Sequence, residues 1–254
     1  MTRALVTGAS SGLGVSFASQ LAAAGNDLVL VARGAAAMER LGTELSGTHG
    51  VHVEVLPADL ADRAQLAKVA ERIGAGDVDT VVNNAGFGLY GPVVGHTEEQ
   101  ELGMVDVDVA AVVGLTLAAT KVMVPRRVGS ILNVASVAAF ATTPESATYS
   151  AAKSFVLMFT EALHDEVLAS GVHVSVLCPG FTRTNFQANA GLEPKLPAFV
   201  WAEADDVVRA GLAALGRNQA VCVPGLLNKV VAASPRFGPR PFVRRLSRRV
   251  MKRL

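Results

Sequence analysis

Seven short apolar runs, rich in β-branched residues, recur along the chain between longer segments with helical spacing. They are ALVT (4–7), DLVLVA (27–32), VHVEVL (51–56), TVVN (80–83), SILNVAS (130–136), VHVSVLC (172–178) and AVCVP (220–224). Runs that are apolar on both faces are typical of strands buried in a parallel sheet. The pattern therefore predicts an α/β fold with helices on both faces of a parallel sheet.

Nothing in the sequence divides this pattern into several domains. Half of the 254 residues are hydrophobic, enough for one large core, and no linker, repeat or low-complexity tract interrupts them. Because crossover connections are right-handed, we expect one Rossmann-type, doubly wound sheet over residues 1–234. Such folds bind ligands beyond the carboxyl ends of their strands.

Residues 235–254 form a basic C-terminal extension. Of the 23 Lys/Arg and 22 Asp/Glu in the chain, eight Lys/Arg and no acid fall here, so residues 1–234 carry a net charge of −7. Phe242, Leu246, Val250 and Leu254 recur at i, i+4 spacing and predict a cationic amphipathic helix. It suits either peripheral contact with an anionic membrane or packing on the protein's own body or a second subunit. No nucleic-acid-reading module accompanies the charge, so we expect no nucleic-acid partner.

The start of the chain and its cysteines indicate a compartment. A strand-like run begins at residue 4, which leaves no room for a signal peptide, and no charge-free run reaches the roughly 18 residues of a membrane span. Cys178 and Cys222 are far apart in the sequence and form no CxxC or Cys/His metal pattern. We therefore expect a cytoplasmic protein with two reduced, buried thiols and no metal.

The turn after the first run, TGASSGLG at 7–14, has the composition of a phosphate-binding loop. Glycines let the backbone approach a pyrophosphate, which the N-terminus of the following helix holds with its free N–H groups. The position between a strand and a helix predicts a dinucleotide site, and a tight turn without a ligand is the alternative. The candidate contacts are Gly8, Ser10, Ser11, Gly12, Leu13 and Gly14.

The second run ends in Ala32 and Arg33, without a carboxylate. Folds that prefer NAD place an acid near this point for the ribose 2′-hydroxyl, whereas a guanidinium matches a 2′-phosphate. The sequence therefore favours NADP(H) and leaves NAD(H) open. An ordinary surface arginine at a strand end is the alternative.

Tyr149 and Lys153 stand at i, i+4 in ATYSAAK and share one face of a predicted helix. An ammonium beside a phenol lowers the phenol pKa from about 10 towards working pH, which makes the tyrosine a general acid or base for a carbonyl. Ser136, at the end of the preceding strand, is placed to hold the same oxygen. A plain exposed Tyr–Lys pair is common, but the order behind a nucleotide-binding turn argues against that reading.

Six segments, in order and spacing, resemble the short-chain dehydrogenase/reductase family: TGASSGLG, Asp59–Leu60, NNAG (83–86), Ser136, YSAAK (149–153) and PGFTRT (179–184). The resemblance covers roughly residues 3–225 and implies hydride transfer between a nicotinamide cofactor and a small-molecule carbonyl or alcohol. It implies Tyr149 as general acid/base, Lys153 as its partner and a ribose ligand, and Ser136 as the group that polarises the carbonyl. It implies a structural role for Asn83 and cofactor contacts at Asp59, Leu60, Asn84, Ala85, Gly86, Pro179, Gly180, Thr182 and Thr184. It also implies a homodimer or homotetramer, for which the apolar segments 110–119 and 154–163 are suited.

The segment DVDV at 106–109 stands where the family usually has a relay asparagine, as in DVNV. Asp108 takes that place, keeps an acceptor and loses the amide donors. We hypothesise a working proton relay with an altered pH dependence. The alternative is that Asp108 only preserves the helix, and Asp106 is expected to be a packing or surface acid.

Five aromatic residues are candidates for an apolar lid over the substrate, and ordinary packing, the commoner role of such residues, is the alternative: Phe140, Phe181, Phe186, Phe199 and Trp201. Such a lid favours a hydrophobic ketone, aldehyde or secondary alcohol. A rival reading is an NADP(H)-binding sensor or scaffold protein with little turnover. The intact Ser136, Tyr149 and Lys153 argue against it, whereas Asp108 and the basic extension leave it open.

Overall fold

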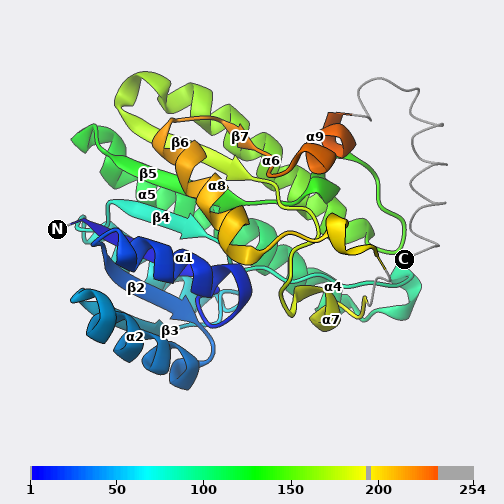
Figure 1. Ribbon diagram of the computed structural model, residues 1–254, viewed down its shortest axis with the longest axis horizontal. Coiled ribbons are helices and arrows are strands. Elements are labelled where there is room, and N and C mark those ends of the chain that lie inside the picture. The colour runs from blue at the N-terminus through cyan, green and yellow to red at the C-terminus, as the bar shows by residue number, and fades with distance from the viewer. Residues whose placement is uncertain (1, 193–195, 234–254) are drawn as a thin grey trace.

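Seven parallel strands form the centre of the protein (Figure 1). The computed structural model describes residues 2–192 and 196–233, so the predicted basic helix at 235–254 lies outside the described residues. The strand order is β3-β2-β1-β4-β5-β6-β7, which confirms the doubly wound sheet, and each apolar run overlaps one strand. The strands are β1 (Arg3–Thr7), β2 (Asp27–Ala32), β3 (Val53–Pro57), β4 (Thr80–Asn83), β5 (Gly129–Val134), β6 (Val172–Leu177) and β7 (Val221–Cys222).

Both faces of the sheet are buried. Along β2, Leu28 and Leu30 join the core on one face, whereas Val29 and Val31 join the core on the other. All four side chains are fully buried. This two-sided burial explains why the strand is apolar at every central position.

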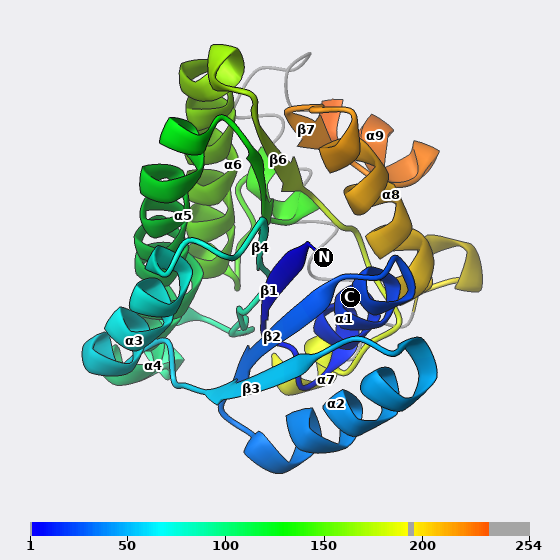
Figure 2. The same ribbon diagram turned by 90° about the vertical axis from the view of Figure 1, so that its left-hand side faces the viewer.

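Helices cover each face as a layer (Figure 2). α1, α2 and α8 pack on one face, and α3, α5 and α6 pack on the other. The longer helices are α1 (Gly12–Ala23), α2 (Ala35–His49), α3 (Arg63–Gly74), α4 (Glu98–Val105), α5 (Val112–Arg126), α6 (Ala147–Val167), α8 (Ala204–Gly216) and α9 (Leu226–Ala233). The short helical segments are η1 (Val93–Gly95), η2 (Asp106–Ala111), η3 (Val137–Phe140), η4 (Leu168–Ser170), α7 (Phe186–Asn189) and η5 (Ala198–Val200).

α4, η2 and α5 form one continuous helical run, Glu98–Arg126. Its middle, η2, is a π-helical turn, a geometry frequent at functional sites. Among the described residues this run alone is long and apolar enough to cross a membrane by length and composition. It packs against α3 and α6, and a core helix of a folded domain meets the same criterion, so the run does not by itself indicate a span.

β1 pairs with both β2 and β4, which marks the point where the winding of the sheet reverses. Ligands of doubly wound sheets bind at the carboxyl ends of the strands beside this point. Here the Thr7 hydroxyl donates to the Val82 carbonyl and accepts the N–H groups of Asn84 and Ala85, both at 2.9 Å. Thr7 therefore holds the loop after β4 against the end of β1.

A buried polar network joins the central strands to two helices. Asn83 Nδ2 donates to Thr116 Oγ1 at 3.0 Å and to Asn133 Oδ1 at 2.8 Å, and Asn133 Nδ2 donates to Thr160 Oγ1 at 2.9 Å. All four side chains are buried. The network fixes β4 and β5 against α5 and α6, as expected for a structural Asn83.

Candidate active site

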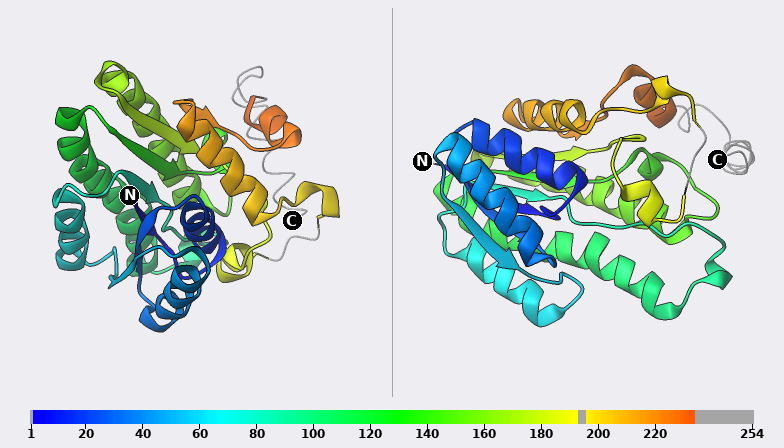
Figure 3. Two further views of the ribbon diagram at one scale, coloured as in Figure 1. Left: turned by 60° about the vertical axis from the view of Figure 1, so that its left-hand side comes forward. Right: turned by 60° about the horizontal axis from the view of Figure 1, so that its bottom comes forward.

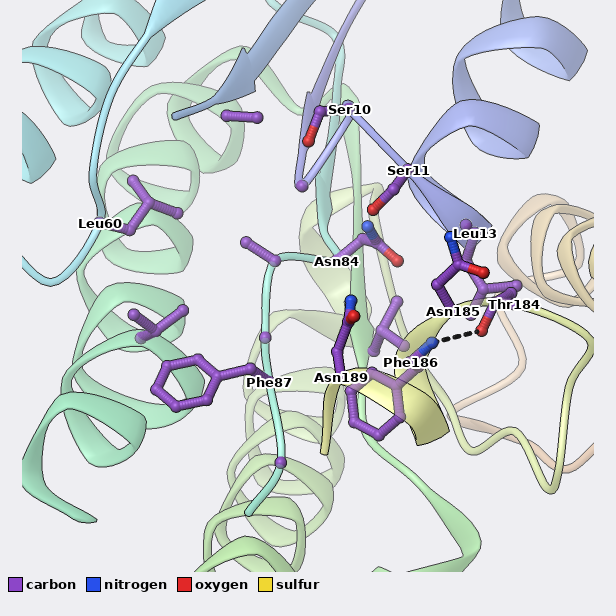
Figure 4. A pocket seen from close by; sticks show the side chains of 18 of the residues that line it. Ser10, Ser11, Leu13, Leu60, Asn84, Phe87, Thr184, Asn185, Phe186 and Asn189 are labelled. Carbon is purple, nitrogen blue, oxygen red and sulfur yellow. Dashed lines mark hydrogen bonds between the residues drawn. The ribbon is translucent and has the colours of Figure 1, made fainter. Parts of the chain in front are cut away.

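A cavity of about 850 Å³ opens beyond the carboxyl ends of the strands. Figure 4 shows Leu60 and Phe87 on one side of it, with Leu13, Thr184 and Asn185 opposite. The predicted site residues in its lining are Gly8, Ser10, Ser11, Gly12, Leu13, Arg33, Asp59, Leu60, Asn84, Ala85, Gly86, Ser136, Lys153, Pro179, Gly180, Thr182 and Thr184. Gly14, Asp108 and Tyr149 are predicted site residues that lie outside the lining.

The turn after β1 fits a pyrophosphate. Gly8 and Gly12 have φ values of 67° and 55°, in the left-handed region that favours glycine. A Cβ on Gly14 would collide with the Gly8 carbonyl oxygen, and a Cβ on Gly8 would lie 2.8 Å from Asn84 Nδ2. Glycine thus lets the turn fold against its neighbours and presents the N-terminus of α1, which begins at Gly12, to the cavity.

Arg33 and Asp59 lie at the edge of the cavity, beyond β2 and β3. Arg33 is exposed and makes no ion pair with another described residue, so its guanidinium is available to an anion. Asp59 is fixed by two contacts: its Oδ1 accepts the Ala61 N–H at 3.0 Å, and its own N–H donates to Gln65 Oε1 at 2.9 Å.

Ser136, Tyr149 and Lys153 meet where β5 faces the start of α6. The Ser136 hydroxyl accepts the Ala138 N–H at 3.1 Å and lies close enough to the Tyr149 phenol to lower its pKa. Lys153 Nζ lies 5.6 Å from the centre of the Tyr149 ring and donates to the Val134 carbonyl at 3.3 Å. The structure therefore brings the three predicted catalytic side chains together.

Asp108 reaches this group from η2. Its Oδ2 lies 2.9 Å from Lys153 Nζ, and its Oδ1 accepts the Phe87 N–H at 3.0 Å. The alignment at Oδ2 is that of an ion pair rather than of a good hydrogen bond. The two side chains are only 0% and 5% exposed. A Cβ on Gly86 would lie 2.9 Å from Oδ1 and 3.0 Å from Nζ, so glycine lets the loop after β4 close over the pair.

Burial and this ion pair shift the pKa values of Tyr149, Asp108 and Lys153. Burial is the largest influence on Tyr149 and raises its pKa. The positive charge of Lys153 and the Ser136 hydroxyl lower this pKa, whereas the negative charge of Asp108 raises it. The net effect is a raised pKa for Tyr149. Burial also raises the pKa of Asp108, and this effect exceeds the lowering by Lys153 and by the hydrogen bond from the Phe87 N–H. Burial opposes the charge of Lys153, but Asp108 and Tyr149 outweigh it and raise the pKa of Lys153. The net direction for Tyr149 is opposite to the sequence-based expectation, because burial and Asp108 outweigh the ammonium.

Asp106 lies apart from this group. Its carboxylate forms an ion pair with Arg63 at 3.3 Å, and the Asp106 side chain is 37% exposed. It is therefore a surface acid, as expected.

The loop after β6 closes the opposite wall. The buried Thr182 hydroxyl donates to the Gly180 carbonyl at 3.0 Å, and Thr184 Oγ1 accepts the Phe186 N–H at 3.3 Å (Figure 4). The Thr182 hydroxyl proton is therefore engaged in a hydrogen bond within the loop. The Thr184 hydroxyl keeps a proton for a bound group.

One of the five aromatic residues expected in the lid, Phe186, lines the cavity. Its ring centre lies 5.7 Å from that of Tyr149, so Phe186 packs against the phenol from the cavity lining. The other four do not line the cavity: Phe181 and Trp201 pack edge-on against each other at 5.6 Å, Phe199 is 79% exposed, and Phe140 packs against a core cluster, so packing holds for three of them.

Several lining residues were missed by sequence reasoning: Phe87, Gly88, Gly103, Val107, Ala135, Asn185, Gln187 and Asn189. They come from loops, α4, η2 and α7, where no periodic pattern shows which residues approach the cavity. The nearest signal was position, since Phe87 and Gly88 directly follow NNAG.

The two thiols are free and buried in neighbouring strand ends. The Cys222 side chain joins the core on one face of the sheet and Cys178 that on the other, so the sulfur atoms point apart. Burial raises the pKa of both thiols. Among the described residues, no group of three or more His, Cys, Asp or Glu is arranged to hold a metal.

Two curated relatives illustrate what the sequence is similar to. The 3-oxoacyl-[acyl-carrier-protein] reductase FabG of Escherichia coli is 30% identical over 230 residues, which cover 87% of this chain and 92% of that protein. The dehydrogenase/reductase SDR family member 7B of Bos taurus is 33% identical over 193 residues, which cover 73% of this chain and only 59% of that protein.

Two solved structures share the fold over the whole chain. A short-chain dehydrogenase from Sphingobium yanoikuyae in complex with NADPH has a TM-score of 0.86 and 33% identity, covering 100% of this chain and 96% of that one. The bulky-bulky ketone specific alcohol dehydrogenase from Comamonas testosteroni has a TM-score of 0.82 and 29% identity, covering 100% and 95%. A family model described as "short chain dehydrogenase" matches residues 2–195, which include the glycine turn and the Ser136–Tyr149–Lys153 group. The chain therefore belongs to the short-chain dehydrogenase/reductase family of NAD(P)-dependent oxidoreductases.

Proposed function

We propose that this protein interconverts an apolar ketone or aldehyde and its alcohol, with NADP(H) as the preferred cofactor. The observation that carries the proposal is the meeting of Ser136, Tyr149 and Lys153 at the same end of the sheet as the glycine turn. A bound nicotinamide cofactor supplies or accepts the hydride. Tyr149 donates a proton to the carbonyl oxygen in reduction and accepts it in oxidation, while Ser136 holds that oxygen by a hydrogen bond.

Residues around the cavity account for cofactor binding. The glycine turn and the N-terminus of α1 hold the pyrophosphate, and Arg33 pairs with a 2′-phosphate, which favours NADP(H) over NAD(H). Asp59 and Leu60 flank the adenine. Lys153 and the Thr184 hydroxyl hold the ribose and the carboxamide at the nicotinamide end.

Asp108 acts as a positioning residue for Lys153 in this proposal. A buried ammonium without a partner would be costly, and the carboxylate at 2.9 Å keeps it charged beside the phenol. The pair carries no net charge, so Tyr149 stays protonated to higher pH than it would beside Lys153 alone. This arrangement suits carbonyl reduction better than alcohol oxidation.

The substrate is bulky and apolar. Phe87, Val107 and Phe186 line the part of the cavity next to the catalytic group. The Comamonas relative is named for bulky-bulky ketones, which agrees with an apolar substrate here.

We also propose a cytoplasmic homodimer or homotetramer. The two free cysteines suit a reducing compartment. Leu117 of α5 and Phe155 and Met158 of α6 are 50%, 44% and 71% exposed and offer an apolar contact between subunits. Sedimentation equilibrium with Met158→Lys as a disrupting variant tests this assembly.

NADPH oxidation across a panel of apolar and polar ketones, run beside NADH, tests the activity. We expect turnover of apolar ketones with NADPH and a loss of at least about a hundredfold in Tyr149→Phe. The second candidate is a cofactor-binding sensor, favoured by the position of Phe186 over the phenol. Cofactor binding without turnover across the panel would support the sensor and end the proposal of an enzyme.

A further inference from the structure

Helix α9, Leu226–Ala233, contacts the rest of the protein through one narrow side of the helix. Ala232 is buried and Asn228 half-buried, one helical turn apart. The outer face is apolar: Leu226, Val230 and Leu227 are 79%, 60% and 45% exposed. Within the described part of the chain, no other helix has so many large apolar side chains turned outwards over so short a length.

The helix that carries this apolar face rests on one wall of the active-site cavity. A Cβ on Gly180, in the loop that lines the cavity, would collide with the Asn228 side chain of α9, so the helix rests directly on that loop. Figure 3 shows α9, in orange, and the yellow segment that contains η5 at the same end of the molecule in both views. Phe199 of η5 is 79% exposed.

The charge next to this face indicates what covers it. α9 leads directly into residues 235–254, with eight Lys/Arg and no acid, while residues 1–234 are acidic overall. Lys229 is exposed on α9 itself. A second copy of the chain would cover an apolar face, but it does not account for the dense run of cations beside that face. The second copy would bring the same run of cations to the contact. Anionic lipid matches both features, since headgroups attract Lys and Arg while the acyl boundary takes up Leu, Val and Phe.

We propose that Leu226, Leu227, Val230 and Phe199 form a docking face for an anionic phospholipid membrane, with residues 235–254 supplying the electrostatic attraction. Docking by this face brings the cavity wall at Gly180, on which α9 rests, close to the bilayer. Apolar carbonyl compounds dissolved in the membrane then reach the site without crossing water, a consequence that rests on the proposed function. The docking itself needs no turnover.

Cosedimentation of the full-length protein with vesicles tests the proposal. We expect binding to phosphatidylcholine mixed with phosphatidylglycerol, little binding to phosphatidylcholine alone, and weaker binding as salt rises. The double variant Leu226→Ser/Val230→Ser should weaken vesicle binding about tenfold or more. Leu168→Ser, a change at a 57% exposed leucine of η4 that lies outside both the docking face and the proposed subunit contact, should leave it unchanged. Arg244→Gln/Arg245→Gln/Arg248→Gln/Arg249→Gln should remove most of the salt-sensitive binding.

Several outcomes would overturn the proposal. One is the absence of binding to anionic vesicles at low salt. Another is an equal loss of vesicle binding in the Leu226/Val230 and Leu168 variants. If sedimentation velocity shows that Leu226→Ser/Val230→Ser abolishes self-association and vesicles bind neither form, the face is a subunit contact. If the same change lowers the melting temperature without any vesicle binding, the face is covered by the protein's own chain. NADPH oxidation in solution, measured on every variant, separates these results from a failure of the proposed activity.

Discussion

Asp108 and Lys153 place two opposite charges in contact next to the Tyr149 phenol, almost completely shielded from water. In such a setting each charge acts on the phenol with little screening. The ammonium stabilises a phenolate and the carboxylate opposes it, so the pair has less effect on the tyrosine than a lone lysine. A single oxygen-for-nitrogen difference from the family's usual asparagine therefore bears on which direction of the reaction is favoured.

Asp108→Asn should move the pH profiles of both directions to lower pH. Asp108 raises the pKa of Tyr149, so its neutralisation lowers that pKa. Reduction needs the protonated phenol and should lose rate at a lower pH on the alkaline side. Oxidation needs the phenolate and should begin at a lower pH on the acid side. Profiles of kcat measured in both directions check this.

Asp106→Asn is the matched control, because Asp106 is a surface acid paired with Arg63. Its profiles should equal those of the unmodified protein. If Asp108→Asn also left them unchanged while retaining the melting temperature, Asp108 would only preserve the helix.

Gly14 tests the close packing of the glycine turn. In Gly14→Ala the new Cβ would collide with the Gly8 carbonyl oxygen, so the turn has to shift. We expect a loss of about 1–3 kcal/mol in the free energy of unfolding, typical of overpacking, and weaker NADPH binding. Gly47→Ala, within α2 and with nothing near the added Cβ, should instead raise stability by about 0.5–1 kcal/mol. Urea titration and cofactor fluorescence measure both effects, and equal behaviour of the two variants would contradict the role of Gly14.

At the scale of the elements, the strands were predictable because a strand that is buried on both faces is a continuous apolar run in the sequence. The run DLVLVA coincides with β2, Asp27–Ala32, and TVVN coincides with β4, Thr80–Asn83. The glycine turn, Ser136 and the Tyr149–Lys153 pair were equally readable, since each depends on residues near in sequence or on an ordered set of motifs.

Contacts between elements that are distant in the sequence produce no comparable sequence pattern. The pairing of Asp108 with Lys153 depends on a π-helical turn and on how η2 packs against α6, and neither follows from apolar spacing. The choice between lid and packing for the aromatic residues stayed open for the same reason. Aromatic residues in a loop are equally suited to pair with each other, as Phe181 and Trp201 do, or to face the cavity, as Phe186 does.

Helix α7 carries a prediction of its own, because it places Phe186 against Tyr149. Phe186→Ala should open space beside the phenol. We expect kcat/KM for bulky ketones to rise about tenfold relative to small ones, the scale on which apolar pockets discriminate by size. Phe199→Ala, at a 79% exposed ring outside the cavity lining, should leave the ratio unchanged. A ratio that stays constant in Phe186→Ala would show that the ring does not limit the substrate.

At the scale of the whole molecule, the cavity belongs to both halves of the sheet. Its lining runs from the loops after β1, β2 and β3 to those after β4, β5 and β6, on either side of the point where the winding reverses. A cofactor that contacts all of them binds only the folded protein. Cofactor binding should therefore stabilise the entire domain rather than one loop.

Thermal unfolding with NADPH and with NADH turns this linkage into a test. At a concentration a hundred times Kd, a ligand adds about 2.7 kcal/mol, which for a chain of this size raises Tm by roughly 5–10 °C. We expect the larger rise with NADPH at equal concentration, because Arg33 is exposed at the cavity edge and available to a 2′-phosphate. Arg33→Ala should remove the difference between the two cofactors, whereas Tyr149→Phe should keep it while lowering turnover at least about a hundredfold. Equal rises for both cofactors in the unmodified protein would refute the preference for NADP(H), and the absence of any rise would refute cofactor binding itself.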